Sequence, residues 1–106
     1  SYKPTMGKTE VHGHHSDPKY LGGNPNQQLT RMTARSHRQL HRDMNKFMKN
    51  KVKNGKSMRP TRGNSGRDIR SNFTRAERLS ALREFYMQYG NQYPKAASDF
   101  FLQHPR

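Results

Sequence analysis

The pattern of apolar and polar positions predicts two short strands near the start of the chain. Residues 29–32 alternate apolar and polar side chains, which is typical of a strand, and residues 9–12 are a candidate partner strand. Residues 16–28 between them are rich in Pro, Gly, Asn and Gln, and the adjacent Gly22 and Gly23 can adopt a positive φ. These segments together predict a hairpin-like unit.

Three helices are predicted after the hairpin. The first begins after Thr33, a good N-cap, and frays near Asn50. Its apolar residues recur at helical spacing and form one face: Leu40, Met44, Phe47 and Met48. Thr74 and Glu77 form a capping box that starts a second helix, and Pro94 suits the first turn of a third. Their inward-facing residues are predicted to be Leu79, Leu82, Phe85, Tyr86, Ala97, Phe100 and Phe101.

Residues 49–72 carry many Lys and Arg side chains, a single Asp, three Gly and a Pro. Because so few apolar residues could offset the entropy of ordering it, this segment is predicted to be a mobile basic arm or a long loop. It serves either as a solvated linker or as a phosphate-tracking arm. The chain is thus predicted to be one α+β domain, with a core motif over 9–50, a basic loop or arm over 51–72 and a helical support over 73–106.

Composition narrows the class of protein. A length of 106 residues allows one small domain, and a hydrophobic content of 28% excludes a large core. The sequence has no apolar stretch long enough for a membrane span, and its start does not resemble a secretory signal. The first residue is Ser, so we expect a piece of a longer polypeptide or an engineered boundary. The absence of cysteine excludes disulfides, thiolate–zinc sites and a cysteine nucleophile.

The chain carries 21 Lys and Arg against 7 Asp and Glu, a net charge of +14. Such a charge predicts salt-dependent binding to nucleic acid, because each cation placed on a phosphate releases counterions. A membrane surface is a weaker alternative, since it needs a helix with a broad apolar face. An oppositely charged protein is a further candidate partner.

The histidines suggest a metal site. His37 and His41 lie four residues apart on the predicted helix and can bind one ion together. His14 and His15 lie just after the predicted first strand. Because neighbouring residues on a strand face opposite sides, only one of them can be the third ligand. The other imidazole is left to take a proton from water near neutral pH, while the cation binds a scissile phosphate. This arrangement is suited to phosphodiester hydrolysis.

The stretch GHHSDPKYLGGNPNQQLTRMTARSHRQLH resembles the HNH, or ββα-metal (His-Me finger), nuclease motif. It is most similar to colicin-type DNases and to the GHH-signature toxin nucleases of Rhs and contact-dependent inhibition proteins. The shared features are the HH-x2-P-x3-GG pattern, Leu29 eight residues before His37, and the H-x3-H pair on a helix. The resemblance covers residues 10–48, and residues 49–106 match no family that we recognise.

This resemblance implies a ββα-metal core in which His15 is the general base and one divalent ion is bound by His14, His37 and His41. The central Asn of the motif, which orients the base, falls on Gln28, with Asn26 and Gln27 beside it. His12 stands where the DNases often carry an acid, and Glu10 precedes it. Three cations flank the expected site and are candidate phosphate contacts: Lys19, Arg35 and Arg38.

The expected function is therefore that of a metal-dependent, non-specific DNA endonuclease using Zn, Ni, Mg or Mn. The resemblance further implies a toxin domain of a secreted effector that acts in the target-cell cytoplasm and is neutralised by an acidic immunity protein. Three alternatives remain at this stage: an RNase on the same scaffold, a non-catalytic nucleic-acid-binding module, and a structural zinc site made of histidines.

Overall fold

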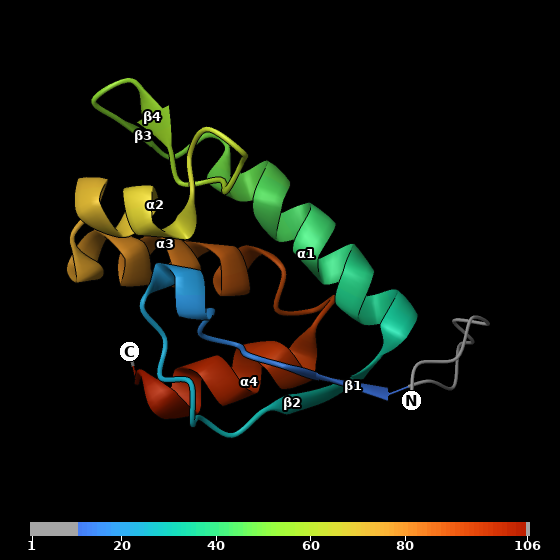
Figure 1. Ribbon diagram of the computed structural model, residues 1–106. Coiled ribbons are helices and arrows are strands. Elements are labelled where there is room, and N and C mark those ends of the chain that lie inside the picture. Colours follow the sequence, from blue (N-terminus) through green and yellow to red (C-terminus); the bar gives the residue numbers. More distant parts are fainter. Residues whose placement is uncertain (1–10, 106) are drawn as a thin grey trace.

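Two antiparallel hairpins and four α-helices form an α+β fold in a computed structural model that describes residues 11–105 (Figure 1). The elements follow in the order β1 (Val11–His14), η1 (Lys19–Leu21), β2 (Thr30–Thr33), α1 (Ala34–Met48), β3 (Val52–Lys53), β4 (Lys56–Ser57), α2 (Gly66–Asn72), α3 (Arg75–Gln88) and α4 (Pro94–Gln103). The coarse prediction of an α+β domain with C-terminal helices is confirmed.

The first hairpin leads directly into α1. Val11 pairs with Thr33 and His14 with Thr30, so β1 and β2 both lie one or two residues later than predicted. Residues 9 and 10 of the predicted first strand lie outside the described residues. The Thr33 side chain accepts a hydrogen bond from the Ser36 N–H at 3.2 Å, and this confirms the predicted N-cap of α1. The hairpin and α1 thus meet at one residue.

The loop between β1 and β2 depends on its two glycines. Gly22 has a φ of 99°, in the left-handed region that glycine tolerates, and ends the 3-10 turn η1. Gly23 is needed for a different reason, because a Cβ there would lie 1.8 Å from the Asp17 carbonyl oxygen. Gln27 closes the loop, since its side chain accepts from the Asp17 N–H and donates to the Asp17 carbonyl oxygen.

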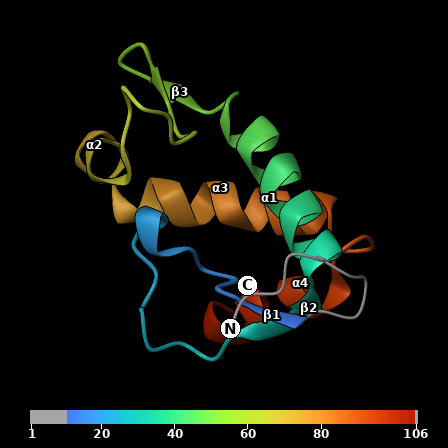
Figure 2. The same ribbon diagram turned by 45° about the vertical axis from the view of Figure 1, so that its right-hand side comes forward.

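The hydrophobic core lies between the helices. α3 contacts both α1 and α4, and α4 also lies along β2 (Figures 1 and 2). The predicted α3 capping box and the Pro at the start of α4 are both observed. The fully buried side chains of this core include Leu40, Met44, Met48, Leu82, Phe85, Tyr86 and Phe100, whereas Leu79 and Phe101 are only partly buried.

Arg78 is a buried cation of α3, with 8% of its surface exposed. Its Nε donates to the Phe73 carbonyl oxygen at 3.0 Å, and its Nη1 donates to the Leu21 carbonyl oxygen at 2.8 Å. Burial lowers its pKa from the ordinary value. These bonds attach the loop after β1 to the helical part of the chain.

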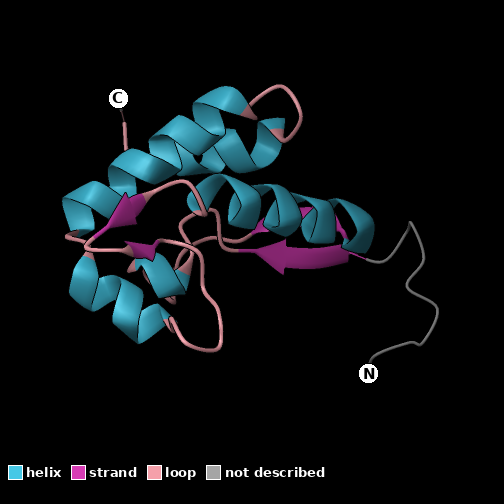
Figure 3. Cartoon of the chain, turned by 90° about the horizontal axis from the view of Figure 1, so that it is seen from above, coloured by secondary structure: helices cyan, strands magenta, loops and turns pink. Residues whose placement is uncertain are grey.

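Residues 49–72 differ from the prediction of an arm or loop. They form the β3–β4 hairpin, at the opposite end of α1 from β1–β2 (Figure 3), followed by α2. Asn54 and Gly55 have φ values of 55° and 76°, and consecutive positive φ values are typical of a tight hairpin turn. Ser65 and Asp68 form a capping box at the start of α2.

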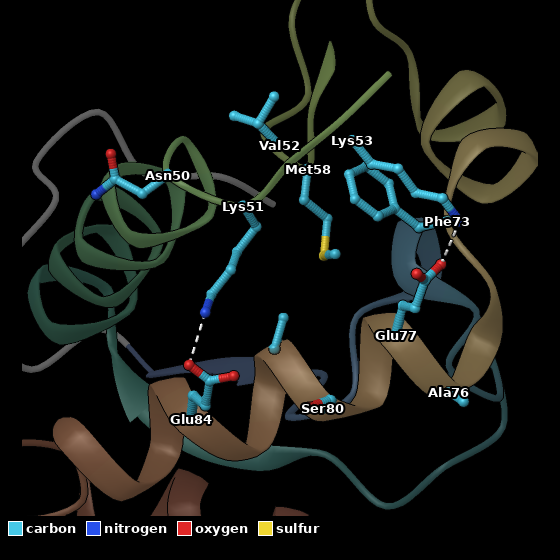
Figure 4. A pocket seen from close by; sticks show the side chains of 11 residues that line it. Asn50, Lys51, Val52, Lys53, Met58, Phe73, Ala76, Glu77, Ser80 and Glu84 are labelled. Carbon is cyan, nitrogen blue, oxygen red and sulfur yellow. Dashed lines mark hydrogen bonds and ion pairs between the residues drawn. The ribbon is translucent and has the colours of Figure 1, made fainter. Parts of the chain in front are cut away.

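Two deeply buried apolar residues hold this segment in place, whereas its Val52 is exposed. Met58 is 2% exposed and Ile69 is fully buried. The hairpin is also tied to α3 by two ion pairs, in which Lys51 binds Glu84 and Lys53 binds Glu77 (Figure 4). None of the helices in the described part of the chain combines the length and the apolar character needed to cross a membrane.

Candidate metal centre

Three imidazoles from two elements converge at one point. His14 ends β1 and is 1% exposed, while His37 and His41 lie one turn apart on α1 and are partly buried. Each offers a ring nitrogen within 4.8 Å of the other two. The ring centroids are 5.2 Å apart for His14–His37, 5.1 Å for His14–His41 and 4.7 Å for His37–His41. The predicted convergence of the three candidate ligands is therefore observed.

The spacing of the nitrogens fits a shared ion. The Nε2 atoms of His37 and His41 are 3.0 Å apart. Two nitrogens bound tetrahedrally at about 2.0–2.1 Å from one zinc ion would be separated by about 3.3 Å. The Nδ1 atom of His14 is buried and has no hydrogen-bond partner among the described residues, which is an unfavourable state that coordination would relieve. The three residues are thus suited to hold one divalent ion.

Burial keeps these imidazoles neutral. It is the largest cause that lowers the pKa of His14 from 6.5 to about 3, with the charges of His41, His37 and His15 adding to it. The pKa of His37 is lowered to about 4, first by burial and then by neighbouring histidines. Burial also lowers the pKa of His41. Neutral imidazoles keep the lone pairs that a metal needs, and three imidazoles suit zinc or nickel.

The candidate base lies beside the three ligands. His15 follows β1, is half-buried, and lines a hollow of about 420 Å³ together with His14, His37 and His41. Its charge contributes to the lowered pKa values of His14 and His37, which places it within electrostatic reach of both. A water in this hollow could therefore contact the candidate base and the candidate metal at once.

The three candidate phosphate contacts are placed differently. Lys19 lines the hollow that holds His15, and Arg38 lines a second hollow of about 490 Å³ on His37 and His41. Arg35 is exposed and is not among the lining residues of either hollow. Arg42, which sequence reasoning missed, lines the second hollow one turn after Arg38. The four-residue spacing of these two arginines on a helix is the signal that could have found it.

Gln28, the residue predicted to orient the base, lies in the loop between His15 and β2. Gln28 is exposed, whereas Gln27 makes the hydrogen bonds that close the loop after His15. Asp17, the residue that Gln27 holds, is 1% exposed and binds Arg75 and His104. His104 packs against Phe100 and binds the Asp17 carboxylate at 2.7 Å.

Two further residues contact the ligands. The Nδ1 atoms of His12 and His37 are 3.1 Å apart, and the Tyr86 hydroxyl is 3.3 Å from Nε2 of His14. The spacing of His12 and His14 in a strand already places both on one face, which is a signal for the first contact. Tyr86 is separated from His14 by 72 residues, so sequence spacing gives no indication of the second.

A larger hollow lies away from the histidines. It measures about 610 Å³ and separates the β3–β4 hairpin from α3 (Figure 4). Its two carboxylates, Glu77 and Glu84, are each paired with a lysine, and its described lining residues include no histidine. The chemistry-bearing side chains are therefore concentrated at β1 and α1.

No family model, curated protein or solved structure matches this chain. The similarity to HNH nucleases consequently stays a prediction that rests on the motif residues.

Proposed function

We propose that this chain is a metal-dependent endonuclease of the ββα-metal type that hydrolyses phosphodiester bonds in DNA. The observation that carries the proposal is the convergence of His14, His37 and His41 beside His15. Strand, strand and helix follow one another as that motif requires. A divalent ion held by the three imidazoles would neutralise charge on the scissile phosphate and on the departing oxygen.

The chain's own residues supply the remaining steps. A ring nitrogen of His15 takes the proton from the attacking water, because His15 lies in the hollow but is not one of the three converging ligands. Lys19 and Arg38 hold the phosphates on either side of the histidines. Such contacts bind the backbone without reading bases, so cleavage is non-specific in sequence.

The biological setting follows from the resemblance and from charge. We propose that the chain is the toxin part of a larger secreted effector and acts in the cytoplasm of a target cell. A net charge of +14 would favour rapid association with an acidic immunity protein. RNA is the alternative substrate, and a non-catalytic nucleic-acid-binding role is the alternative function.

A plasmid-relaxation assay tests the activity. Supercoiled plasmid is incubated with the protein and Zn, Ni, Mg or Mn, with EDTA in a parallel series and an RNA substrate beside it. His15→Ala is expected to bind metal but to cleave at least about 100-fold more slowly, because it lacks the general base. Asn91→Ala, at an exposed position between α3 and α4, is the control.

Two results would overturn the proposal. The first is wild-type cleavage that persists in EDTA, or the absence of cleavage with every ion tested. The second is full activity of the His15→Ala protein, which would remove the assigned base. If the protein cleaves RNA faster than DNA, the proposed substrate becomes RNA, and the proposed hydrolysis of phosphodiester bonds still holds.

A further inference from the structure

Tyr86 connects the middle of α3 to the candidate metal centre. It is 1% exposed, and its ring stacks on Phe100 with centroids 5.0 Å apart and meets Phe85 edge-on at 5.1 Å. Because aromatic neighbours from two helices fix this ring, its hydroxyl has a defined position. That position lies between the backbone after His15 and the ring of His14.

The direction of the hydroxyl proton follows from its partners. The carbonyl oxygen of Ser16 can only accept, and it lies 2.7 Å from the Tyr86 oxygen, so the hydroxyl donates to it. The phenol oxygen therefore accepts from Nε2 of His14, which is 3.3 Å away.

This contact decides which nitrogen of His14 is free. A neutral imidazole carries one N–H, so a proton on Nε2 leaves the lone pair on Nδ1. The Nδ1 atom is the buried nitrogen that has no hydrogen-bond partner within residues 11–105. Ligand histidines commonly donate their second nitrogen to a neighbouring acceptor, which fixes both the tautomer and the ring direction.

We propose that Tyr86 is a positioning residue that makes Nδ1 the metal-binding nitrogen of His14. The proposal rests on the metal centre of the proposed function. The centre would then combine Nδ1 of His14 with Nε2 of His37 and His41, the pair that lies 3.0 Å apart. By holding His14 and the Ser16 carbonyl together, Tyr86 also fixes the backbone on both sides of His15.

Tyr86→Phe tests this assignment, because it keeps the ring and removes only the hydroxyl. We expect the affinity of the metal-free protein for Zn²⁺, measured by competition with a chromophoric chelator, to fall about 10- to 100-fold. Tyr93→Phe is the matched control. Tyr93 is also buried, and its hydroxyl donates to the Asp43 carboxylate at a distance of 2.5 Å. This hydrogen bond involves none of the three histidines, so its loss should leave Zn²⁺ affinity unchanged.

Nitrogen-15 NMR of the histidine rings gives a second, independent readout. The metal-free wild-type protein should show His14 protonated at Nε2, and the Tyr86→Phe protein should show a mixture of tautomers. A His14 proton on Nδ1 in the wild-type protein would overturn the assignment even if Tyr86→Phe did not fold. Unchanged Zn²⁺ affinity in Tyr86→Phe, or an equal loss in Tyr93→Phe, would overturn it as well.

Failure of the proposed function gives a different result. A wild-type protein that binds Zn²⁺ with the expected tautomer but cleaves no nucleic acid would refute the nuclease and support the role of Tyr86. A wild-type protein that binds no divalent ion would refute the metal centre, and with it the positioning role.

Discussion

Asp17 offers the sharpest test of how the segment after His15 is held. Its carboxylate, with 2% of the side chain exposed, receives Arg75 Nη2 at 2.5 Å, Arg75 Nη1 at 3.1 Å and His104 Nε2 at 2.7 Å. The substitution Asp17→Asn keeps the size of the side chain and removes its charge. The guanidinium of Arg75 and the ring of His104 then both lose their anionic partner.

The expected loss in the free energy of unfolding can be compared with the loss at an exposed ion pair in the same protein. Removing one partner of a buried ion pair costs about 3–5 kcal/mol, but the Arg75 side chain is 34% exposed and water will replace part of the interaction. We therefore expect Asp17→Asn to lower the free energy of unfolding by about 2–3 kcal/mol. Glu84→Gln removes the charge from the Lys51–Glu84 pair, whose glutamate side chain is 54% exposed, and should cost less than about 1 kcal/mol.

Urea denaturation of both variants in EDTA measures the difference without a contribution from bound metal. For a domain of this size the Asp17→Asn protein should also melt about 10 °C or more below the wild type. Higher salt should reduce the effect of Glu84→Gln more than that of Asp17→Asn, because exposed charges are screened more strongly. Equal losses of stability in the two variants would show that the Asp17 cluster is no stronger than a surface pair.

Two further predictions concern the histidines and the arginines. The lowered pKa of His14, about 3 against 6.5 when unfolded, means that only the unfolded chain binds this proton as the pH falls below 6.5. Metal-free protein should therefore lose about 2 kcal/mol of stability from His14 alone between pH 6.5 and 5, as measured by urea denaturation, and His14→Asn should remove that part of the pH dependence. A stability that rises on acidification would contradict this sign. Arg38→Ala should weaken DNA binding and reduce its salt slope by about 1, whereas Arg35→Ala should change neither, as a binding titration at several salt concentrations can show. Equal effects of the two substitutions would refute the assignment of Arg38.

The helices were predictable because their signals are local. Thr33 and Thr74 cap α1 and α3, and apolar residues at helical spacing mark the buried faces. Residues 49–72 were not, because their order depends on two well-buried anchors, Met58 and Ile69, and on ion pairs to α3. The basic composition of residues 49–72 indicates a mobile arm, because it does not show that α3 supplies carboxylates that bind two of its lysines.

The same distinction applies to the candidate site. The convergence of His14, His37 and His41 could be predicted from a strand, a helix and the spacing within each. The contacts that surround them could not, because Tyr86 and His104 lie 72 and 87 residues along the chain from their partners. The sequence also could not show that Gln27 closes the loop after His15, since loop geometry decides which of two adjacent amides reaches Asp17.

The hydrogen bonds from Tyr86 and His104 to Ser16 and Asp17 have a consequence for the order in which the centre forms during synthesis of the chain. Tyr86 donates to the Ser16 carbonyl oxygen from 70 residues later in the chain, and His104 binds the Asp17 carboxylate from 87 residues later. All four histidines of the candidate centre emerge from the ribosome long before these partners do. The centre of a nascent chain would therefore stay incomplete until α3 and α4 have been synthesised and have packed against the loop after β1.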